Sequence, residues 1–342
     1  EAGVLRSYSG SDTEVSVPGG VTALADRVFA RSSVTSVELP DTVERIGASA
    51  FEGAASLASV TVRDARGQVG EGLPSALRQI GARAFLGTGL AVINVPDSVS
   101  DIGPGAFALM PSLTGVNIGS DVREGQLVST FTASPRLKAI TVKADNASYE
   151  SVDGVLFTKG RDTLLTYPLG RAGVSYTVPD GTRALAQESF EGAPLDEVTL
   201  PDSLRRIDRY AFVGSRLSSL TLPDSFETIG AHAFRGVTSL TWVNIGGTTT
   251  IGESAFDGDR NLTAINFRSD LARLTSIGAN ALRGVPVTPP ALTSARAQAE
   301  TPASDTASGN APTPAPIASP EATGSDSASD DRATGGDAAP AT

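Results

Sequence analysis

The sequence predicts an α/β solenoid, a stack of about ten 22-residue units that share one parallel β-sheet face. In most units a short alternating apolar stretch leads to a turn signal, and an aromatic residue follows at a fixed distance. The recurring residues are Phe29, Phe51, Phe85, Phe107, Phe131, Phe190, Phe212, Phe234, Phe256 and Leu282, with spacings of 22, 34, 22, 24, 59, 22, 22, 22 and 26. A constant base period broken by two larger insertions is typical of repeat architectures.

The first element of each unit is a six-residue stretch such as 217–222 (LSSLTL) or 240–245 (LTWVNI). Positions one, four and six are apolar, and the polar residue at position five gives strand periodicity. A Pro-Asp pair often follows, as at Pro201-Asp202. Proline ends a ladder because it lacks an N–H, and aspartate favours a turn by accepting a hydrogen bond from nearby backbone.

The second element runs from an Ile-Gly step through an Ala-Phe pair, and we expect a short helical turn there. Glycine follows in most units, as at Gly236, which fits the preference of helix C-termini for glycine. The chain's one histidine, His232, lies in this element (TIGAHAF, 228–234). Other units place Ser49, Arg83, Gly105, Tyr210 or Ser254 at the same position. A position that accepts all of these should be exposed and chemically unconstrained, so we expect His232 to have no function.

Composition narrows the function classes. The chain of 342 residues has no cysteine, one histidine and a net charge of -11. Cysteine-ligated zinc, thiol catalysis and disulfides are therefore excluded, and an acidic chain is a poor partner for nucleic acid. The glycine cluster at 67–72 lacks the Lys-Ser/Thr of a phosphate loop. We expect no catalytic residues, no metal and no cofactor. No run of 18 apolar residues occurs, so no membrane span is expected in this segment.

The pattern L-x-x-V-x-L-P-D followed by I-G-x-x-A-F-x-G resembles the BspA-like leucine-rich repeat family of bacterial surface proteins. The resemblance covers roughly residues 15–285, and the stretch 149–181 is similar to a hairpin insert common in that family. It implies a leucine-rich repeat solenoid that is non-enzymatic, secreted or displayed on the bacterial surface, and used for adhesion to host, matrix or neighbouring-cell proteins.

The domain organisation follows from where the repeats stop. We expect an N-terminal cap or linker at 1–14 and the solenoid at 15–287, with insertions near 63–74 and 143–174. Residues 288–342 are rich in Pro, Ala, Ser, Thr and Asp, with two arginines against seven acidic residues. Such a segment buries too little apolar surface to fold, so it is predicted to be a disordered linker.

The candidate binding residues lie at the outward positions of the predicted strands. Most of these positions hold small polar residues, which also help neighbouring strands to pair. Trp242 is the only tryptophan and is predicted to point outward. Exposed aromatic side chains are enriched in binding hot spots. The predicted ligand site therefore comprises Trp242, Asn244, Glu197, Thr199 and Thr221.

The function predicted from the sequence is a monomeric interaction module located outside the cell or on its surface. Its partner would be a protein or glycan ligand, such as a host or matrix protein. Two alternatives stay open: an accessory binding domain of a larger secreted enzyme, and an architectural spacer of the envelope.

Overall fold

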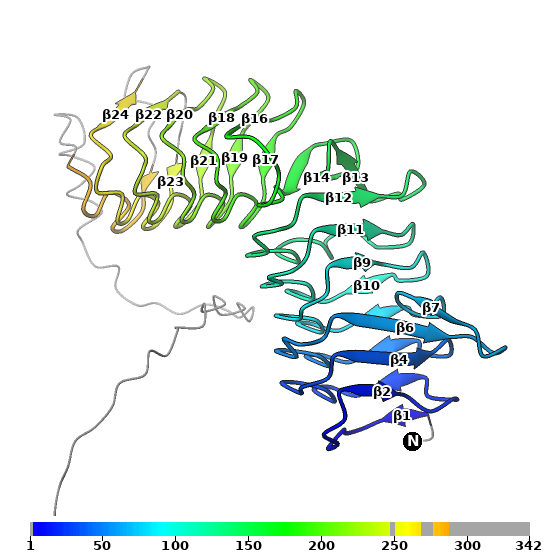
Figure 1. The fold of residues 1–342 in the computed structure, drawn as a ribbon. Coiled ribbons are helices and arrows are strands. Elements are labelled where there is room, and N and C mark those ends of the chain that lie inside the picture. The colour runs from blue at the N-terminus through cyan, green and yellow to red at the C-terminus, as the bar shows by residue number, and fades with distance from the viewer. Residues whose placement is uncertain (1–2, 247–249, 268–275, 287–342) are drawn as a thin grey trace, which may run out of the picture. The chain divides into compact units, whose positions relative to one another are not determined.

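The computed structural model describes residues 3–246, 250–267 and 276–286. Over these residues the chain forms a parallel β-solenoid of about twelve turns (Figure 1). The described residues form strands and turns but no helix, so the predicted α/β class is wrong. The predicted count of about ten units is also too low. The predicted linker at 288–342 lies outside the described residues.

A ladder of longer strands, which we call the long ladder, contains the predicted L-x-x-V-x-L stretches. Neighbouring strands pair in parallel over most of its length, which confirms the predicted parallel face. Its strands are β2 (Glu14–Ser16), β4 (Ser36–Pro40), β6 (Ser59–Arg63), β9 (Val92–Asn94), β11 (Gly115–Ile118), β12 (Ala139–Val142), β16 (Ser175–Thr177), β18 (Glu197–Thr199), β20 (Ser219–Thr221), β22 (Trp242–Ile245) and β24 (Ala264–Phe267).

The Ile-Gly step forms a second parallel ladder, the short ladder, which the sequence analysis treated as a connection. Its strands are β1 (Val4–Leu5), β3 (Ala23–Leu24), β5 (Arg45–Ile46), β8 (Gln79–Ile80), β10 (Asp101–Ile102), β15 (Thr163–Thr166), β17 (Ala184–Leu185), β19 (Arg206–Ile207), β21 (Thr228–Ile229), β23 (Thr250–Ile251) and β25 (Ser276–Ile277). Glycine after the isoleucine lets adjacent turns approach closely. A Cβ on Gly230 would lie 2.5 Å from the backbone nitrogen of Arg209 in the preceding turn.

The Ala-Phe stretch bonds to the next turn of the solenoid and does not coil into a helix. The N–H groups of His232, Phe234 and Gly236 donate to carbonyls of the following turn at 2.8, 2.8 and 3.0 Å. Between them, Ala233 N–H donates back to Gly230 at 3.3 Å. His232 has φ of 56°, in the left-handed region that an α-helix does not use. Every second N–H in this stretch therefore bonds to the next turn of the solenoid and not within its own turn. The i→i−4 hydrogen bonds of an α-helix cannot form in this arrangement.

The aromatic residues of the turns stack in two columns inside the core. Phe29, Phe51, Phe85, Phe107 and Phe131 have successive ring centroids 5.2, 5.1, 5.6 and 5.8 Å apart. In the second column, Tyr167 and Phe190 are 5.3 Å apart, and Phe190, Phe212, Phe234 and Phe256 continue at 4.9, 5.2 and 5.1 Å. Phe212, Phe234 and Phe256, which recur every 22 residues in the sequence, are thus consecutive rungs of one column. The 59-residue spacing hid an additional turn, because tyrosine replaces phenylalanine at Tyr167.

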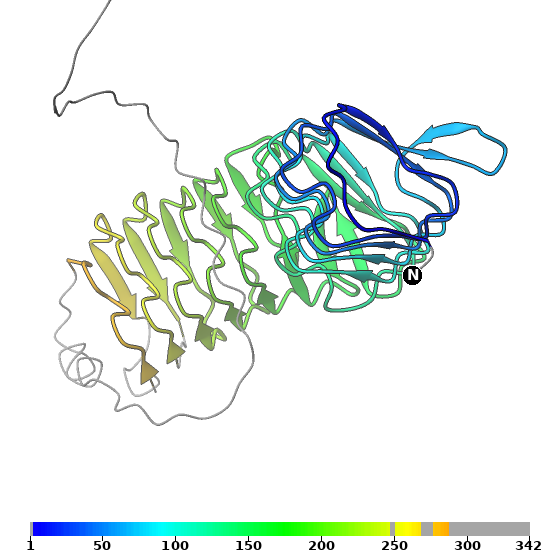
Figure 2. The ribbon, with the colours of Figure 1, turned by 90° about the horizontal axis from the view of Figure 1, so that it is seen from below.

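Two hairpins interrupt the regular turns. β6 pairs antiparallel with β7 (Val69–Glu71), and this hairpin projects from the solenoid (Figure 2, light blue). β13 (Tyr149–Val152), β14 (Val155–Thr158) and β15 form an antiparallel set. Its alternate side chains enter different cores: Leu156 belongs to the N-terminal core, and Phe157 and Val155 belong to the C-terminal core. This second insertion therefore lies between two packed cores and contributes side chains to both.

Candidate functional site

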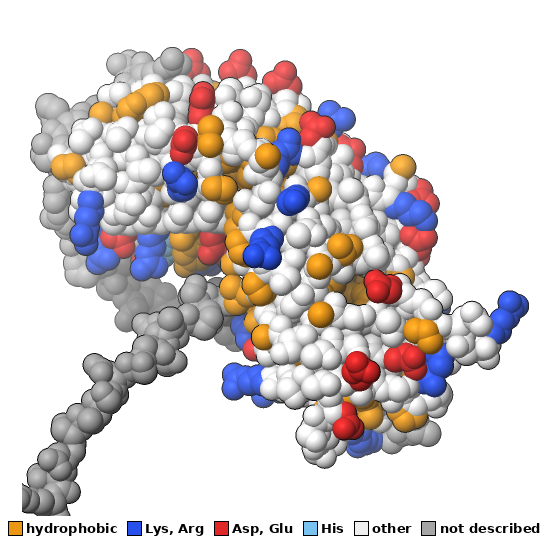
Figure 3. Space-filling view, in the orientation of Figure 1, with side chains coloured by type: hydrophobic (Ala, Val, Ile, Leu, Met, Phe, Trp, Pro, Cys, Tyr) orange, Lys and Arg blue, Asp and Glu red, His pale blue; other side chains and the backbone are white. Residues whose placement is uncertain are grey.

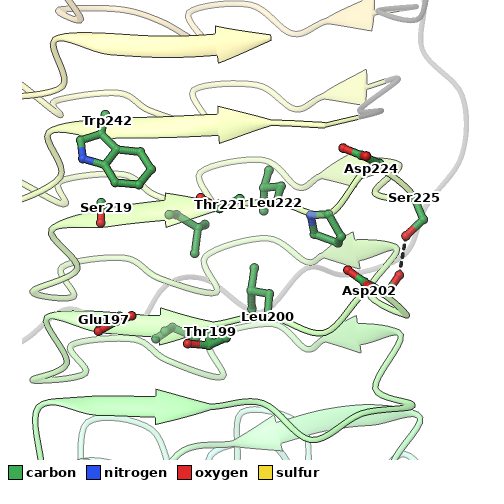
Figure 4. Close-up of a pocket in the computed structure, with 13 residues that line it drawn as sticks. Glu197, Thr199, Leu200, Asp202, Ser219, Thr221, Leu222, Asp224, Ser225 and Trp242 are labelled. Atoms are coloured by element: carbon green, nitrogen blue, oxygen red, sulfur yellow. Dashed lines mark hydrogen bonds between the residues drawn. The ribbon is translucent and has the colours of Figure 1, made fainter. Parts of the chain in front are cut away.

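The candidate site is an open groove on the outer side of β18, β20 and β22, with a volume of about 540 Å³ (Figure 4). Four of the five predicted site residues line it, and Asn244 does not. The complete lining is Glu197, Val198, Thr199, Leu200, Asp202, Ser219, Leu220, Thr221, Leu222, Pro223, Asp224, Ser225 and Trp242.

The groove lies at one of three places where pairing between described strands of the long ladder is interrupted; the other two separate β6 from β9 and β12 from β16. β16 and β18 form one sheet and β20, β22 and β24 form another, so β18 and β20 share no strand pairing. Backbone bonds still join these turns just before the strands, from Ser218 N–H to the Asp196 carbonyl and from Arg216 N–H to the Ala193 carbonyl, at 3.0 Å each. Leu200 beside the opening is only half-buried, whereas Leu222 at the same position of the next turn is fully buried. The opening thus exposes apolar surface and strand edge.

Trp242 stands at one end of the groove with its side chain 38% exposed. In the strand register its neighbours are Ser219 and Ala264. Both neighbours are small, so they leave much of the indole surface uncovered. The predicted outward orientation of Trp242 agrees with this exposure.

The outward-facing residues two positions further along these strands are Thr199, Thr221 and Asn244. Some of their side chains form hydrogen bonds between neighbouring strands. Asn244 Nδ2 donates to Thr221 Oγ1 at 3.3 Å, and Asn266 Nδ2 donates to Asn244 Oδ1 at 2.8 Å. An equivalent bond joins Asn117 to Asn94 in the N-terminal turns. Asn244 therefore supports strand pairing from a place outside the groove, whereas Thr199 and Thr221 line the groove.

Carboxylates lie at both ends of the groove, and no lysine or arginine is among its described lining residues. Glu197 lies in the same column as Ser219 and Trp242, and Asp202 and Asp224 lie at the opposite end (Figure 4). The side chains of Glu197 and Asp202 form no ion pair with a described residue. Figure 3 shows acidic side chains along the edge formed by β16 to β22. The lining therefore carries negative charge, and one guanidinium lies beside it at the Asp202 end, where Arg205 Nη1 donates to the Asp202 carbonyl at 3.0 Å and to Ser225 Oγ at 2.5 Å.

Sequence analysis missed Asp202 and Asp224 because every Pro-Asp aspartate was assigned to a turn. For Asp41 and Asp97 this is correct, since their carboxylates accept backbone N–H bonds from the next turn at 3.2 Å each. Asp202 forms no such side-chain bond with a described residue. Its backbone carbonyl accepts from Ser225 Oγ at 2.5 Å and from Arg205 Nη1 at 3.0 Å. No local sequence signal separates these two kinds of Pro-Asp pair.

A model of the BspA type leucine-rich repeat region matches residues 7–72, 71–153 and 174–286, in six copies. The chain belongs to the BspA-type leucine-rich repeat family. A leucine-rich repeat protein from Eubacterium ventriosum is similar in fold, with 20% identity, a TM-score of 0.64, and coverage of 84% of this chain and 91% of its own. The pneumococcal vaccine antigen PcpA has 20% identity and a TM-score of 0.56, and the match covers 86% of this chain and 92% of that protein. No curated protein matches the sequence.

His232 in this BspA-type solenoid occupies a position that is constrained, contrary to the expectation. Its counterparts Ser49 and Ser254 are buried, and His232 itself is half-buried. Its ring stacks on Tyr210 with centroids 5.0 Å apart. Burial, helped by the nearby charge of Arg235, lowers the pKa of the His232 imidazole. The residue is therefore a neutral packing element at neutral pH, and it lies outside the groove.

The described part of the BspA-type chain holds no group of three or more His, Cys, Asp or Glu side chains that could bind a metal ion. It also contains no helix able to cross a membrane. A second hollow of about 550 Å³ lies between the loop at 124–128 and the short ladder, and it includes Val128, Leu165 and Ile207. This second hollow lacks an exposed aromatic side chain, so the groove beside Trp242 is the better candidate for recognition.

Proposed function

We propose that the chain is a non-enzymatic protein-interaction module that binds its partner in the groove beside Trp242. One observation supports it most: the repeat scaffold opens between β18 and β20, and an exposed tryptophan, hydroxyl side chains and carboxylates border the opening. Protein interfaces are typically built from a few aromatic anchors within a polar rim. Leucine-rich repeat solenoids present extended surfaces suited to this role.

The non-enzymatic part of the proposal is supported by the residue types available. The chain has no cysteine, and its single histidine is a stacked side chain in a turn. Nucleophile, base and orienting group must meet in one site for acyl transfer or hydrolysis of that type. The functional groups in the groove are carboxylates, hydroxyls and one indole beside apolar side chains, and these suit recognition.

We place this module outside a bacterial cell, in adhesion to another protein. Membership in the BspA-type family supports this location, as does the fold similarity to a protein described as a vaccine antigen. A linker composition at 288–342 is consistent with display at a distance from an attachment point.

Binding of the fluorescently labelled full chain to an array of purified extracellular and matrix proteins tests the proposal. Each binder is then titrated with the parent chain, with Trp242→Ala and with Val92→Ala. Val92 is the matched control because it is an exposed residue at the same outward position of β9. We expect about a tenfold or larger loss with Trp242→Ala and no change with Val92→Ala. An array without any saturable binder contradicts the interaction function, and equal binding by both variants contradicts the groove.

A further inference from the structure

The first outward row of the C-terminal long ladder has an unusual order of side chains. Strand register aligns Ser175 with Glu197, and Trp242 with both Ser219 and Ala264. Figure 4 shows Glu197, Ser219 and Trp242 in one column. A carboxylate and an indole therefore stand on either side of a serine.

The small serine leaves a notch between the two larger side chains. β20 and β22 are paired and lie about 4.8 Å apart, whereas β18 and β20 are not paired, so the backbones of Glu197 and Trp242 are separated by at least roughly 9.6 Å. Ser219 carries only a hydroxymethyl group between them. A planar group that enters this space would meet the indole on one side and the Glu197 carboxylate on the other (Figure 4).

Guanidinium is the protein side-chain group that fits this pair of neighbours. It is planar, stacks on aromatic rings and bonds carboxylates through two parallel N–H donors. A cation over an indole face is attracted by the ring quadrupole. Lysine carries the charge but lacks the planar fork, so it meets only part of this geometry.

The rest of the groove favours an extended, positively charged segment. Thr199 and Thr221 offer hydroxyls to a peptide backbone, and Asp202 and Asp224 add negative potential at the far end. The chain's own residues 288–342 carry two arginines against seven acidic residues, so their composition argues against them as the occupant.

We infer that the groove binds an extended segment of a partner protein through an arginine whose guanidinium lies over Ser219, between Glu197 and Trp242. This inference rests on the proposed function and specifies the partner chemistry. Recognition by charge and stacking predicts that binding weakens as ionic strength rises, because part of the attraction is between exposed charges.

The experiment uses Trp242 as its own reporter, since it is the only tryptophan in the chain. Nine-residue peptides of serine and threonine carry arginine at positions 3 and 7, which lie on the same side of an extended peptide. Matched peptides carry lysine, citrulline or glutamate at both positions. Each is titrated into the full chain while Trp242 emission is recorded.

We expect the arginine peptide to bind about tenfold more tightly than the citrulline peptide, with lysine between them. Glu197→Gln should weaken arginine binding about tenfold. Glu14→Gln is the control, because Glu14 is an exposed glutamate at the same outward position of β2 and its change removes the same charge. Equal affinities for arginine and citrulline, or equal effects of the two substitutions, would overturn the inference.

A neutral oligosaccharide, maltoheptaose, completes the titration. A saturable emission change with the sugar and none with the arginine peptide would show a glycan groove and would also overturn the inference. These failures are separate from failure of the proposed function. If an array protein still binds in a way that depends on Trp242, the proposed interaction function and the groove stand. Only the assignment of arginine as the recognised group would then be wrong.

Discussion

Asp259 is an acid buried in the core at a position where other turns place Ala54, Ser215 or Val237. Its Oδ1 accepts the Val237 N–H at 2.8 Å, and its Oδ2 has no partner among the described residues. Burial raises the pKa of the Asp259 carboxyl to about 8, and the neighbouring charge of Asp257 adds to the rise. The residue is therefore protonated in the folded protein at neutral pH.

This burial predicts a pH-dependent stability with a definite sign. Because the folded pKa is above the ordinary value of 3.8, the folded state holds the proton more tightly than the unfolded chain does. The Asp259 contribution to the free energy of unfolding is fully present below pH 4 and falls as pH rises toward 8. Asp259→Asn keeps the acceptor for Val237 without the ionisation. We expect it to melt higher than the parent at pH 8 and to match it closely at pH 4. If the difference in melting temperature between parent and variant stayed the same from pH 4 to pH 8, the raised pKa of Asp259 would be contradicted.

His232 gives a second prediction at this scale, because its φ of 56° restricts which residues fit. Asparagine tolerates the left-handed region, whereas a β-branched residue there is strongly disfavoured. His232→Asn loses the stack on Tyr210 and should change the free energy of unfolding by no more than about 1 kcal/mol. His232→Val should cost roughly 2 kcal/mol more. Urea denaturation of both variants measures the difference, and an equally stable valine variant would show that the backbone constraint is weak.

Secondary-structure elements show where sequence reasoning succeeded and where it failed. The L-x-x-V-x-L stretches were predicted as strands because their period of two is visible without a structure. The Ile-Gly step gave no such signal, since a two-residue strand such as β21 is too short to show a repeated alternation of apolar and polar residues. The prediction of a helical turn was wrong because the positions with left-handed backbone hold diverse side chains. The sequence therefore gives no sign of their backbone conformation.

Aromatic stacking predicts the largest single-residue effects on stability. Phe234 is fully buried, with ring centroids of Phe212 and Phe256 5.2 and 5.1 Å away. Phe234→Ala should lower the free energy of unfolding by about 3–5 kcal/mol, since the cavity lies between two rigid rungs. Val92→Ala is the control at an exposed strand position and should stay within about 0.5 kcal/mol. A Phe234→Ala melting curve that coincides with the parent would refute the stacked column.

Close approach of turns at the short ladder predicts opposite outcomes for two glycines. A Cβ at Gly230 would lie 2.5 Å from the Arg209 nitrogen, inside contact distance with rigid backbone. At Gly115 in β11 no atom lies within 4 Å of the added carbon. Gly230→Ala should therefore destabilise clearly, whereas Gly115→Ala should be neutral or slightly stabilising because alanine restricts the unfolded chain. Thermal unfolding distinguishes them, and a neutral Gly230→Ala would mean that neighbouring turns are spaced more widely.

Over the molecule as a whole, the candidate site follows from an irregularity in a regular scaffold. The sequence predicted the outward row, and four of its five proposed residues border the groove. The opening between β18 and β20 could not be predicted, because both strands carry the same L-x-x-V-x-L pattern as their paired neighbours. Asp202 and Asp224 were missed for the same reason: their local sequence equals that of Asp41 and Asp97, whose carboxylates accept backbone N–H bonds from the next turn.

The central claim is that a partner protein occupies the opened groove. Hydrogen–deuterium exchange of the full chain, with and without a saturating binder from the array, measures this for each segment. The account predicts slower exchange at 197–202 and 219–225 on binding, and unchanged exchange at 92–94 and 115–118 on the same ladder. Protection confined to the turns at 208–214 and 230–236, with none at 197–202 or 219–225, would contradict it.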